Sequence, residues 1–407
     1  MFSEMTMKLF VFAFVLFVCI AVPAFAALPP LTPMDADIPE GVATKIVCQI
    51  PESVRTNVAA GQEPFSDTVY HYVVLLPMGY KADEKREYPV LWIASPAGNA
   101  TPVTYKNALA RERMIGIALV ESKNGPFRPV QENYIAALLD ASQRFRLAHG
   151  FGVATGFSGA ARASSFFAIH TLFGGVILQG AGTAGPQVDF TRKNPACCVY
   201  GILGIGDFNV AEGPGLVARL PDGRFSLQSG GHAPAQLAAF DEGLTFVLDA
   251  IYTQRENTHK NAMEQYVVRF RILHQRIRGH GPHSITMYEA LEAANRIAIA
   301  RKFSTDPTLA DDKQLQREIV TVARMLEELP RHPAVSIELE ARAVFNKVRD
   351  EENAKWPANV RDLTAFAKQC AVEYDAVAAK FPNTLYGKKA AGRAAWLAKG
   401  VEKEKGG

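Results

Sequence analysis

A serine set between small residues, at the end of an apolar run, constrains the fold of this chain more than any other feature. Residues 153–157 have the pattern of a short buried strand, Ser158 follows them, and a helix-forming stretch comes next. A strand that turns sharply into a helix needs small residues around the serine, and Gly156, Gly159 and Ala160 are small. The segment therefore predicts a nucleophile elbow, in which the serine hydroxyl stands clear of a sheet.

The start of the helix after this serine has chemical consequences of its own. Backbone N–H groups that open a helix carry partial positive charge, so the N–H of Gly159 is a candidate donor to an oxyanion. The last glycine of the pattern G-x-S-x-G is replaced by Ala160 in this chain. A simpler interpretation is that Ser158 only caps the helix, because serine is a favoured N-cap residue.

The length and the amino terminus indicate an exported protein with two structural parts. A chain of 407 residues exceeds the size at which one core usually stops growing, and a net charge of +3 is too small to indicate nucleic acid as a partner. Lys8, an apolar run over 9–22 and small residues around Ala26 predict a signal peptide over 1–26. The run is shorter than the roughly 20 residues of a membrane span. We therefore expect a periplasmic or extracellular protein without a membrane span after cleavage.

Four cysteines remain after the expected cleavage, namely Cys48, Cys197, Cys198 and Cys370. An exported chain permits disulfides. Cys197 and Cys198 are adjacent in a strand pattern, where successive side chains face opposite sides, so at most one of them would pair with Cys48. Buried free thiols are the alternative interpretation.

Strand and helix patterns alternate over the first part of the mature chain, which we expect to form one catalytic domain over 27–254. The expected strands are residues 44–50, 69–76, 89–94, 115–120, 151–157, 175–178, 198–203 and 224–228, with the first two antiparallel. The expected helices are residues 105–113, 130–147, 160–170 and 235–252. This alternation predicts an α/β fold with a doubly wound, mostly parallel sheet, whose ligands bind at the carboxyl ends of the strands.

The remaining residues, 255–407, show only helical spacing and predict an all-helical module at the carboxyl terminus. Apolar stripes run over 263–277, 315–326, 337–348 and 363–377. The end of the chain, over 381–397, is similar to one helix-turn-helix unit of the tetratricopeptide type, which would suit a protein partner. A plain helical bundle is the alternative.

A serine nucleophile needs a histidine base and an acid that orients it, and in folds with this elbow the acid precedes the histidine in the chain. Asp207 comes just after a buried strand pattern and is the expected acid. Glu212 in the same loop and Asp222 in a Pro-Asp-Gly turn are its competitors. His232 follows a short strand and two glycines, which let its loop approach Ser158 closely, and it is the expected base.

A second oxyanion donor is expected in the loop after the strand over 89–94. Pro96 has no N–H to donate, so Ala97 or Gly98 is the candidate beside Gly159.

The sequence predicts neither a metal site nor a cofactor. His274, His280 and His283 cluster in the sequence, but no carboxylate or cysteine accompanies them, and a loop between helices explains them better. The glycine-rich patterns that bind dinucleotides or nucleotide phosphates do not occur in the sequence.

Taken together, these segments resemble the α/β-hydrolase superfamily and, within it, secreted esterases similar to polyhydroxybutyrate depolymerases and to feruloyl or acetylxylan esterases. The resemblance covers roughly residues 65–254 and is carried by the motifs at 95–99, 156–162, 206–209 and 230–232. It implies an ester or polyester substrate, an acyl-enzyme and no cofactor, with Ser158, Asp207 and His232 as the catalytic triad.

Two alternatives from other classes stay open. One is a catalytically inactive binding protein on the hydrolase fold, and the other is a serine peptidase on the same fold, which would attack amides. The chain has Ala233 and Pro234 where such esterases commonly have an aromatic residue after the histidine, and it has Ala160 in the elbow. These departures concern the substrate more than the fold.

Overall fold

The computed structural model divides the chain into two compact units, Met1–Val199 and Tyr200–Gly407, and each is described by itself. The expected domain boundary near residue 254 stays a prediction. The expected signal peptide lies outside the described residues. The structure describes residues 35–50, 65–66, 68–171, 173–185, 190, 194, 197–204, 206–213, 223–228, 230–254, 261–277, 283–355 and 360–403.

The first unit contains a mixed sheet in which the predicted strands are present. Its strands are Thr44–Val47 (β1), His71–Leu75 (β2), Val90–Ala94 (β3), Ile115–Leu119 (β4), Val153–Phe157 (β5) and Gly175–Gln179 (β6), in the order β1-β2-β4-β3-β5-β6. β2 runs antiparallel to β1 and β4, whereas β3 is parallel to β4 and β5, and β5 is parallel to β6. All residues of β3 and β4 are buried, which explains why their sequences are continuous apolar runs.

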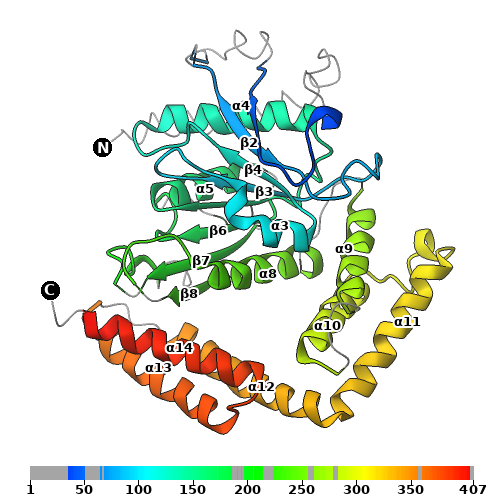
Figure 1. The fold of residues 1–407 in the computed structure, drawn as a ribbon, viewed down its shortest axis with the longest axis vertical. Coiled ribbons are helices and arrows are strands. Elements are labelled where there is room, and N and C mark those ends of the chain that lie inside the picture. Colours follow the sequence, from blue (N-terminus) through cyan, green and yellow to red (C-terminus); the bar gives the residue numbers. More distant parts are fainter. Residues whose placement is uncertain are drawn as a thin grey trace. The chain divides into compact units, whose positions relative to one another are not determined.

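Helices flank this sheet within the first unit (Figure 1), and they are Lys106–Glu112 (α3), Phe127–Arg144 (α4) and Gly159–His170 (α5). α4 packs against α5, since the rings of Tyr134 and Phe167 stack with centroids 3.8 Å apart. α4 begins three residues before the expected start, with Pro129 inside its first turn. A proline is tolerated there because the first N–H groups of a helix have no intrahelical acceptor.

A buried carboxylate on α4 holds the segment before β2. Glu132 accepts hydrogen bonds at 2.5 Å from both Ser66 Oγ and Tyr70 Oη, and Arg128 Nε donates to it at 2.7 Å. Burial alone would raise the pKa of Glu132, but these three donors lower it below its ordinary value of 4.5. The ionised carboxylate is therefore the form that stabilises the fold.

Glu132→Gln is expected to lower the stability at neutral pH and to matter less in acid. Because the folded pKa of Glu132 is lowered, its stabilising effect is present above the unfolded value of about 4.5 and is lost as the pH falls through the folded value. Urea unfolding of the wild type and the variant at pH 7, 4 and 3 measures this effect. The exposed Glu84→Gln is the control, and a wild-type advantage that persisted unchanged at pH 3 would contradict the expectation.

The second unit combines two parallel strands with a long helical region. The strands are Cys198–Gly204 (β7, which begins at the end of the first unit) and Arg224–Gln228 (β8), paired from Tyr200 onward. The helices are Leu237–Thr253 (α8), Ala262–Arg276 (α9), Ile285–Ala300 (α10), Lys313–Glu328 (α11), Pro333–Ala354 (α12), Val360–Lys380 (α13) and Leu385–Lys403 (α14). The predicted α/β class and helical carboxyl-terminal region are confirmed.

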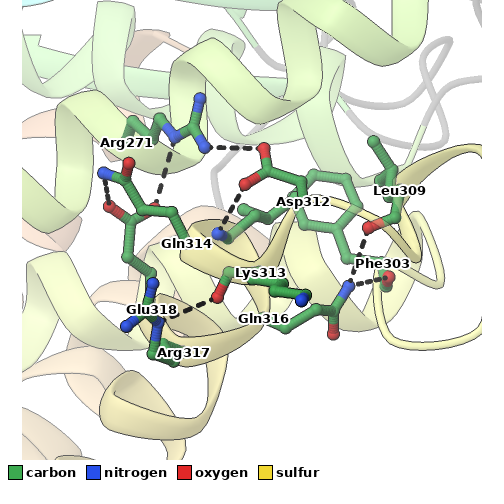
Figure 2. Close-up of polar contacts among 10 residues, drawn as sticks. Arg271, Phe303, Leu309, Asp312, Lys313, Gln314, Gln316, Arg317 and Glu318 are labelled. Carbon is green, nitrogen blue, oxygen red and sulfur yellow. Dashed lines mark hydrogen bonds and ion pairs between the residues drawn. The ribbon is translucent and has the colours of Figure 1, made fainter.

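Polar contacts tie α9 to the start of α11 (Figure 2). Arg271 on α9 lies 2.8 Å from Asp312 and 3.2 Å from Glu318, through Nη2 and Nε respectively. Asp312 also caps α11, because its Oδ1 accepts the Leu315 N–H at 2.9 Å. This hydrogen bond and the charge of Arg271 lower the pKa of Asp312 against a smaller opposing effect of burial.

The last helices share a hydrophobic core with β7 and β8 in the second unit. Leu203 and Leu227 belong to the same buried cluster as Tyr374, Ala390 and Leu397. The helical region is thus more than an appended bundle, because it supplies the apolar surface on which these two strands are buried.

α13 and α14 form a helical hairpin, and they lie side by side in Figure 1. Thr384 caps α14, because its Oγ accepts the Gly387 N–H at 2.9 Å. A Cβ on Gly387 would lie 1.8 Å from the Phe381 carbonyl oxygen, so the tight turn needs a glycine there. The likeness of this hairpin to a tetratricopeptide unit stays a prediction.

The four cysteines that follow the expected signal peptide are buried thiols in the structure. Burial is the main reason why the pKa of the Cys48 thiol is raised. It is also the main reason why the pKa of the Cys370 thiol is raised to about 12. A high pKa keeps a thiol protonated and unreactive.

Neither a membrane span nor a metal cluster is found in the described part of the chain. No helix there is both long and apolar enough to cross a bilayer. No group of three or more metal-ligating side chains occurs among those residues either. His280 lies outside the described residues, and the His283 ring stacks on that of His332 at 4.1 Å.

Candidate active site

Ser158 stands at the turn between β5 and α5 in the first unit. Its backbone has φ 56° and ψ −124°, a conformation that is unusual for a residue other than glycine. The Ser158 N–H donates to the Gln179 carbonyl on the neighbouring strand at 2.8 Å, and its own carbonyl accepts the Ala161 N–H at 3.0 Å. The strained backbone is therefore held from both sides, and the serine is left half-buried.

A close contact with backbone requires a glycine at position 156 near Ser158, whereas a movable side chain lies against Gly159. A Cβ on Gly156 would lie 2.5 Å from the Ala160 carbonyl oxygen, and one on Gly159 would lie 2.1 Å from Asn124 Oδ1. Ala160 is itself only 4% exposed. The turn thus accommodates a methyl group at position 160 but not at position 156.

Gly156→Ala is expected to destabilise the protein by about 1–3 kcal/mol, as overpacking of a tight site usually does. The added methyl group would push the first turn of α5 away from β5, because the atom in its way belongs to the backbone. Thermal or urea unfolding measures this change. Gly392→Ala on α14 is the matched control, since a Cβ there meets nothing within 4 Å. It is expected to be neutral or stabilising, and equal losses in both variants would contradict the steric explanation.

The loop after β3 contains the other expected oxyanion donors. The Ala97 N–H donates to Ser95 Oγ at 3.3 Å, and the Gly98 N–H donates to the Ser95 carbonyl at 3.2 Å. Gly98 has φ +71°, and Ala97 forms an isolated antiparallel bridge with Lys123 of the loop after β4. Both candidate N–H groups therefore have acceptors within their own loop, and the bond from Ala97 is long.

A cavity of about 210 Å³ lies beside the serine in the first unit. It is bounded by the loops after β3 and β4, by the first turn of α4 and by the first turns of α5. Gly159 lines it directly, together with Ser122, Lys123, Phe127 and Arg162 among others. The loop after β3 and Gly159 were predicted from the sequence, whereas the loop after β4 was not, because it carries no motif.

Asp207 and His232 lie together in the second unit, after the carboxyl ends of β7 and β8. His232 Nδ1 is 3.0 Å from each carboxylate oxygen of Asp207, and Asp207 is 2% exposed. The Asn209 N–H also donates to Asp207 Oδ1 at 2.8 Å. A carboxylate can only accept, so Nδ1 carries the hydrogen in the neutral imidazole and Nε2 is its acceptor nitrogen.

Glycines allow the two loops to interlock around this pair. A Cβ on Gly204 would lie 2.3 Å from the Gly231 carbonyl oxygen, and the Gly206 N–H donates to the Gly230 carbonyl at 2.9 Å. Gly230 has φ +101°, which a residue with a side chain rarely adopts. The competing acid Asp222 lies outside the described residues.

Phe208 is a further candidate site residue, which was not predicted from the sequence. Its side chain is 76% exposed, and its ring centroid is 4.2 Å from that of His232. An exposed aromatic ring beside the histidine offers a surface for an apolar part of a substrate. The signal in the sequence was its position directly after Asp207.

Among known proteins, the chain matches solved structures but no family model and no curated sequence. A ferulic acid esterase is similar at 13% identity with a TM-score of 0.40, covering 52% of this chain and 99% of its own. A fluorophosphonate-binding serine hydrolase from Staphylococcus aureus is similar at 10% identity with a TM-score of 0.39, and the match covers 52% of this chain and 99% of that protein. An IroE-like serine hydrolase from Shewanella oneidensis is similar at 12% identity with a TM-score of 0.39, and the match covers 72% of this chain and 99% of that protein.

The fold itself is established by the strands of this chain. Parallel strands predominate, an antiparallel pair opens the sheet, and β5 enters α5 through a serine with positive φ. The chain is therefore an α/β protein of α/β-hydrolase-like architecture with a helical carboxyl-terminal region.

Proposed function

We propose that the protein is an exported serine hydrolase that cleaves carboxylic esters through an acyl-enzyme. Ser158 is the nucleophile, His232 is the general base and Asp207 orients the imidazole. The observation that carries the proposal is the pairing of His232 Nδ1 with a buried carboxylate, which supplies a base in the correct tautomer. The strained turn at Ser158 supports it, because the turn holds a hydroxyl at the end of a central strand.

In this mechanism the Ser158 hydroxyl attacks the ester carbonyl while His232 Nε2 takes its proton. The C–O bond of the ester then breaks, and the imidazolium returns the proton to the leaving alcohol. Water repeats the sequence on the acyl-enzyme and releases the acid. Asp207 stays ionised throughout and stabilises the imidazolium.

The negative charge of the tetrahedral intermediate needs two donors near Ser158. The Gly159 N–H is the first, because it occupies the first position of α5, where an N–H has no intrahelical acceptor. The Ala97 N–H is the second, since its 3.3 Å bond to Ser95 Oγ is weak enough to be exchanged for an oxyanion.

One observation favours the noncatalytic alternative, a binding protein on the same fold. The N–H groups of Ala97 and Gly98 both donate to Ser95. A protein that had lost catalysis would keep these bonds when a ligand enters, whereas an esterase exchanges one of them.

Labelling with a fluorophosphonate probe tests the proposal, because the probe reacts with an activated serine. We expect the probe to attach to the peptide that contains Ser158, and we expect Ser158→Ala to lose both labelling and hydrolysis of short acyl esters. Ser336→Ala, at an exposed position on α12, is the control and is expected to behave as the wild type. Absence of labelling in a folded protein would favour the binding protein. Faster turnover of aminoacyl amides than of acyl esters would favour a peptidase.

A further inference from the structure

The cavity beside Gly159 carries positive charge. Lys123 from the loop after β4 and Arg162 from α5 both line it. Among the described residues that line this cavity, none is acidic. Glu121, in the same loop as Lys123, instead binds His71 on β2, at 2.7 Å through the backbone N–H and at 2.8 Å through the ring.

A buried hydroxyl also lines this cavity. Ser122 is 1% exposed, and within the described part of the chain its Oγ has no hydrogen-bond partner. A buried hydroxyl without a partner is costly, and most such groups in proteins are satisfied. An acceptor on a ligand in the cavity would satisfy it.

The position of Arg162 is fixed by the protein. Its Nη1 donates to the Thr183 carbonyl at 3.1 Å, and the following residue, Ala184, also lines the cavity. A guanidinium held in this way has its position in the cavity wall set by the protein, without a ligand to order it.

Another wall of the cavity is apolar. Phe127 and Val130 of α4 and Ala163 of α5 line the cavity. Phe127 is 39% exposed and is held edge-on against Phe166, with ring centroids 4.9 Å apart. The cavity thus combines an apolar wall with a cationic end and a hydroxyl donor.

We infer that this cavity binds a carboxylate of the substrate, so that the preferred esters are anionic. The inference rests on the proposed function. The carboxylate accepts a hydrogen bond from Ser122 Oγ and is paired with Lys123, while a short carbon chain lies against Phe127. The carboxylate belongs either to the acid part or to the alcohol part of the ester. In both cases the same group, a carboxylate, occupies the cavity.

Two matched pairs of esters test the inference and distinguish these sources. The first compares 4-nitrophenyl hydrogen glutarate with 4-nitrophenyl pentanoate, and the second compares 4-acetoxybenzoate with 4-acetoxybenzamide. We expect kcat/KM to favour the anionic member of one pair by about tenfold or more, as a hydrogen bond to a charged group usually does. The preference is expected to fall with added salt, because Lys123 is exposed.

Three variants assign the effect to the cavity. Lys123→Gln and Ser122→Ala are each expected to remove most of the charge preference, mainly through KM. Lys85→Gln is the control for charge, because this exposed lysine precedes β3 and so lies at the opposite edge of the parallel strands. Ser122→Ala also separates a role in binding from a role in folding. Because the Ser122 hydroxyl has no partner in the described structure, its removal is expected to leave the free energy of unfolding unchanged or higher.

A binding measurement separates failure of this inference from failure of the proposed function. Calorimetry on Ser158→Ala is expected to detect glutarate or 4-hydroxybenzoate but not pentanamide. Binding without hydrolysis by the wild type would retain the inference and reject the esterase. Hydrolysis of the neutral esters with no charge preference, together with no carboxylate binding, would overturn the inference alone.

Discussion

Asp207→Asn is expected to lower kcat for ester hydrolysis by about 10⁴-fold while the protein stays folded, which is the effect of losing the orienting carboxylate of a Ser-His-Asp triad. An amide has an NH₂ group that would donate to His232 Nδ1, which moves the imidazole hydrogen to Nε2 and removes the base. The side-chain oxygen of asparagine can still accept the Asn209 N–H, so the loop after β7 keeps its anchor.

Steady-state rates and the rate of fluorophosphonate labelling measure this loss, and circular dichroism checks the fold. Glu212→Gln is the matched control, because it makes the same chemical change in the same loop. A normal rate in Asp207→Asn together with a large loss in Glu212→Gln would reassign the acid to Glu212.

Glu352→Ala is expected to lower the free energy of unfolding by about 3–5 kcal/mol, the cost of breaking a buried ion pair from one side. Glu352 Oε1 lies 2.5 Å from Arg393 Nη2, and Tyr374 Oη donates to Oε2 at 2.7 Å. Arg393 also donates to the Leu227 carbonyl on β8. Burial opposes the charge on Arg393, yet Glu352 outweighs it and raises the pKa of the guanidinium. Without Glu352 the positive charge stays in the core unpaired.

Urea unfolding followed by circular dichroism measures this effect. Glu351→Ala is the control, because the adjacent Glu351 pairs with Lys355 at the surface, where solvent screens an ion pair and it contributes little to stability. The double variant Glu352→Met with Arg393→Met is expected to recover most of the loss, since an apolar pair of similar size avoids the buried charge. Similar losses for Glu351→Ala and Glu352→Ala would contradict the buried-pair explanation.

The strands of this chain were predictable because burial on both faces leaves a clear mark on a sequence. β3 is a continuous apolar run between Pro89 and Ser95, β4 lies inside one between Arg113 and Glu121, and both strands appear where expected. The turn at Ser158 was predictable for a steric reason, since a Cβ on Gly156 would meet the backbone of the first turn of α5. The pairing of Asp207 with His232 followed from the order of the two residues after successive strands.

Other features were not predictable, because they depend on segments that meet only in three dimensions. The cavity combines Ser122, Phe127 and Arg162 from three separate elements, and no motif marks them together. α10 was not singled out, since alanines occupy much of its buried face and give a weak apolar pattern. The bond from Arg393 to β8 joins residues 166 positions apart, which is beyond any local pattern.

The core that β8 shares with α13 and α14 also affects when the loop after β8 can become ordered. Tyr374, Ala390 and Leu397 of these two helices complete the apolar layer around Leu227. Since both helices follow β8 at a long distance in the sequence, β8 acquires its final packing during synthesis only after they have emerged from the ribosome. The loop that holds His232 begins at the end of β8, so His232 is fixed in place only at that stage.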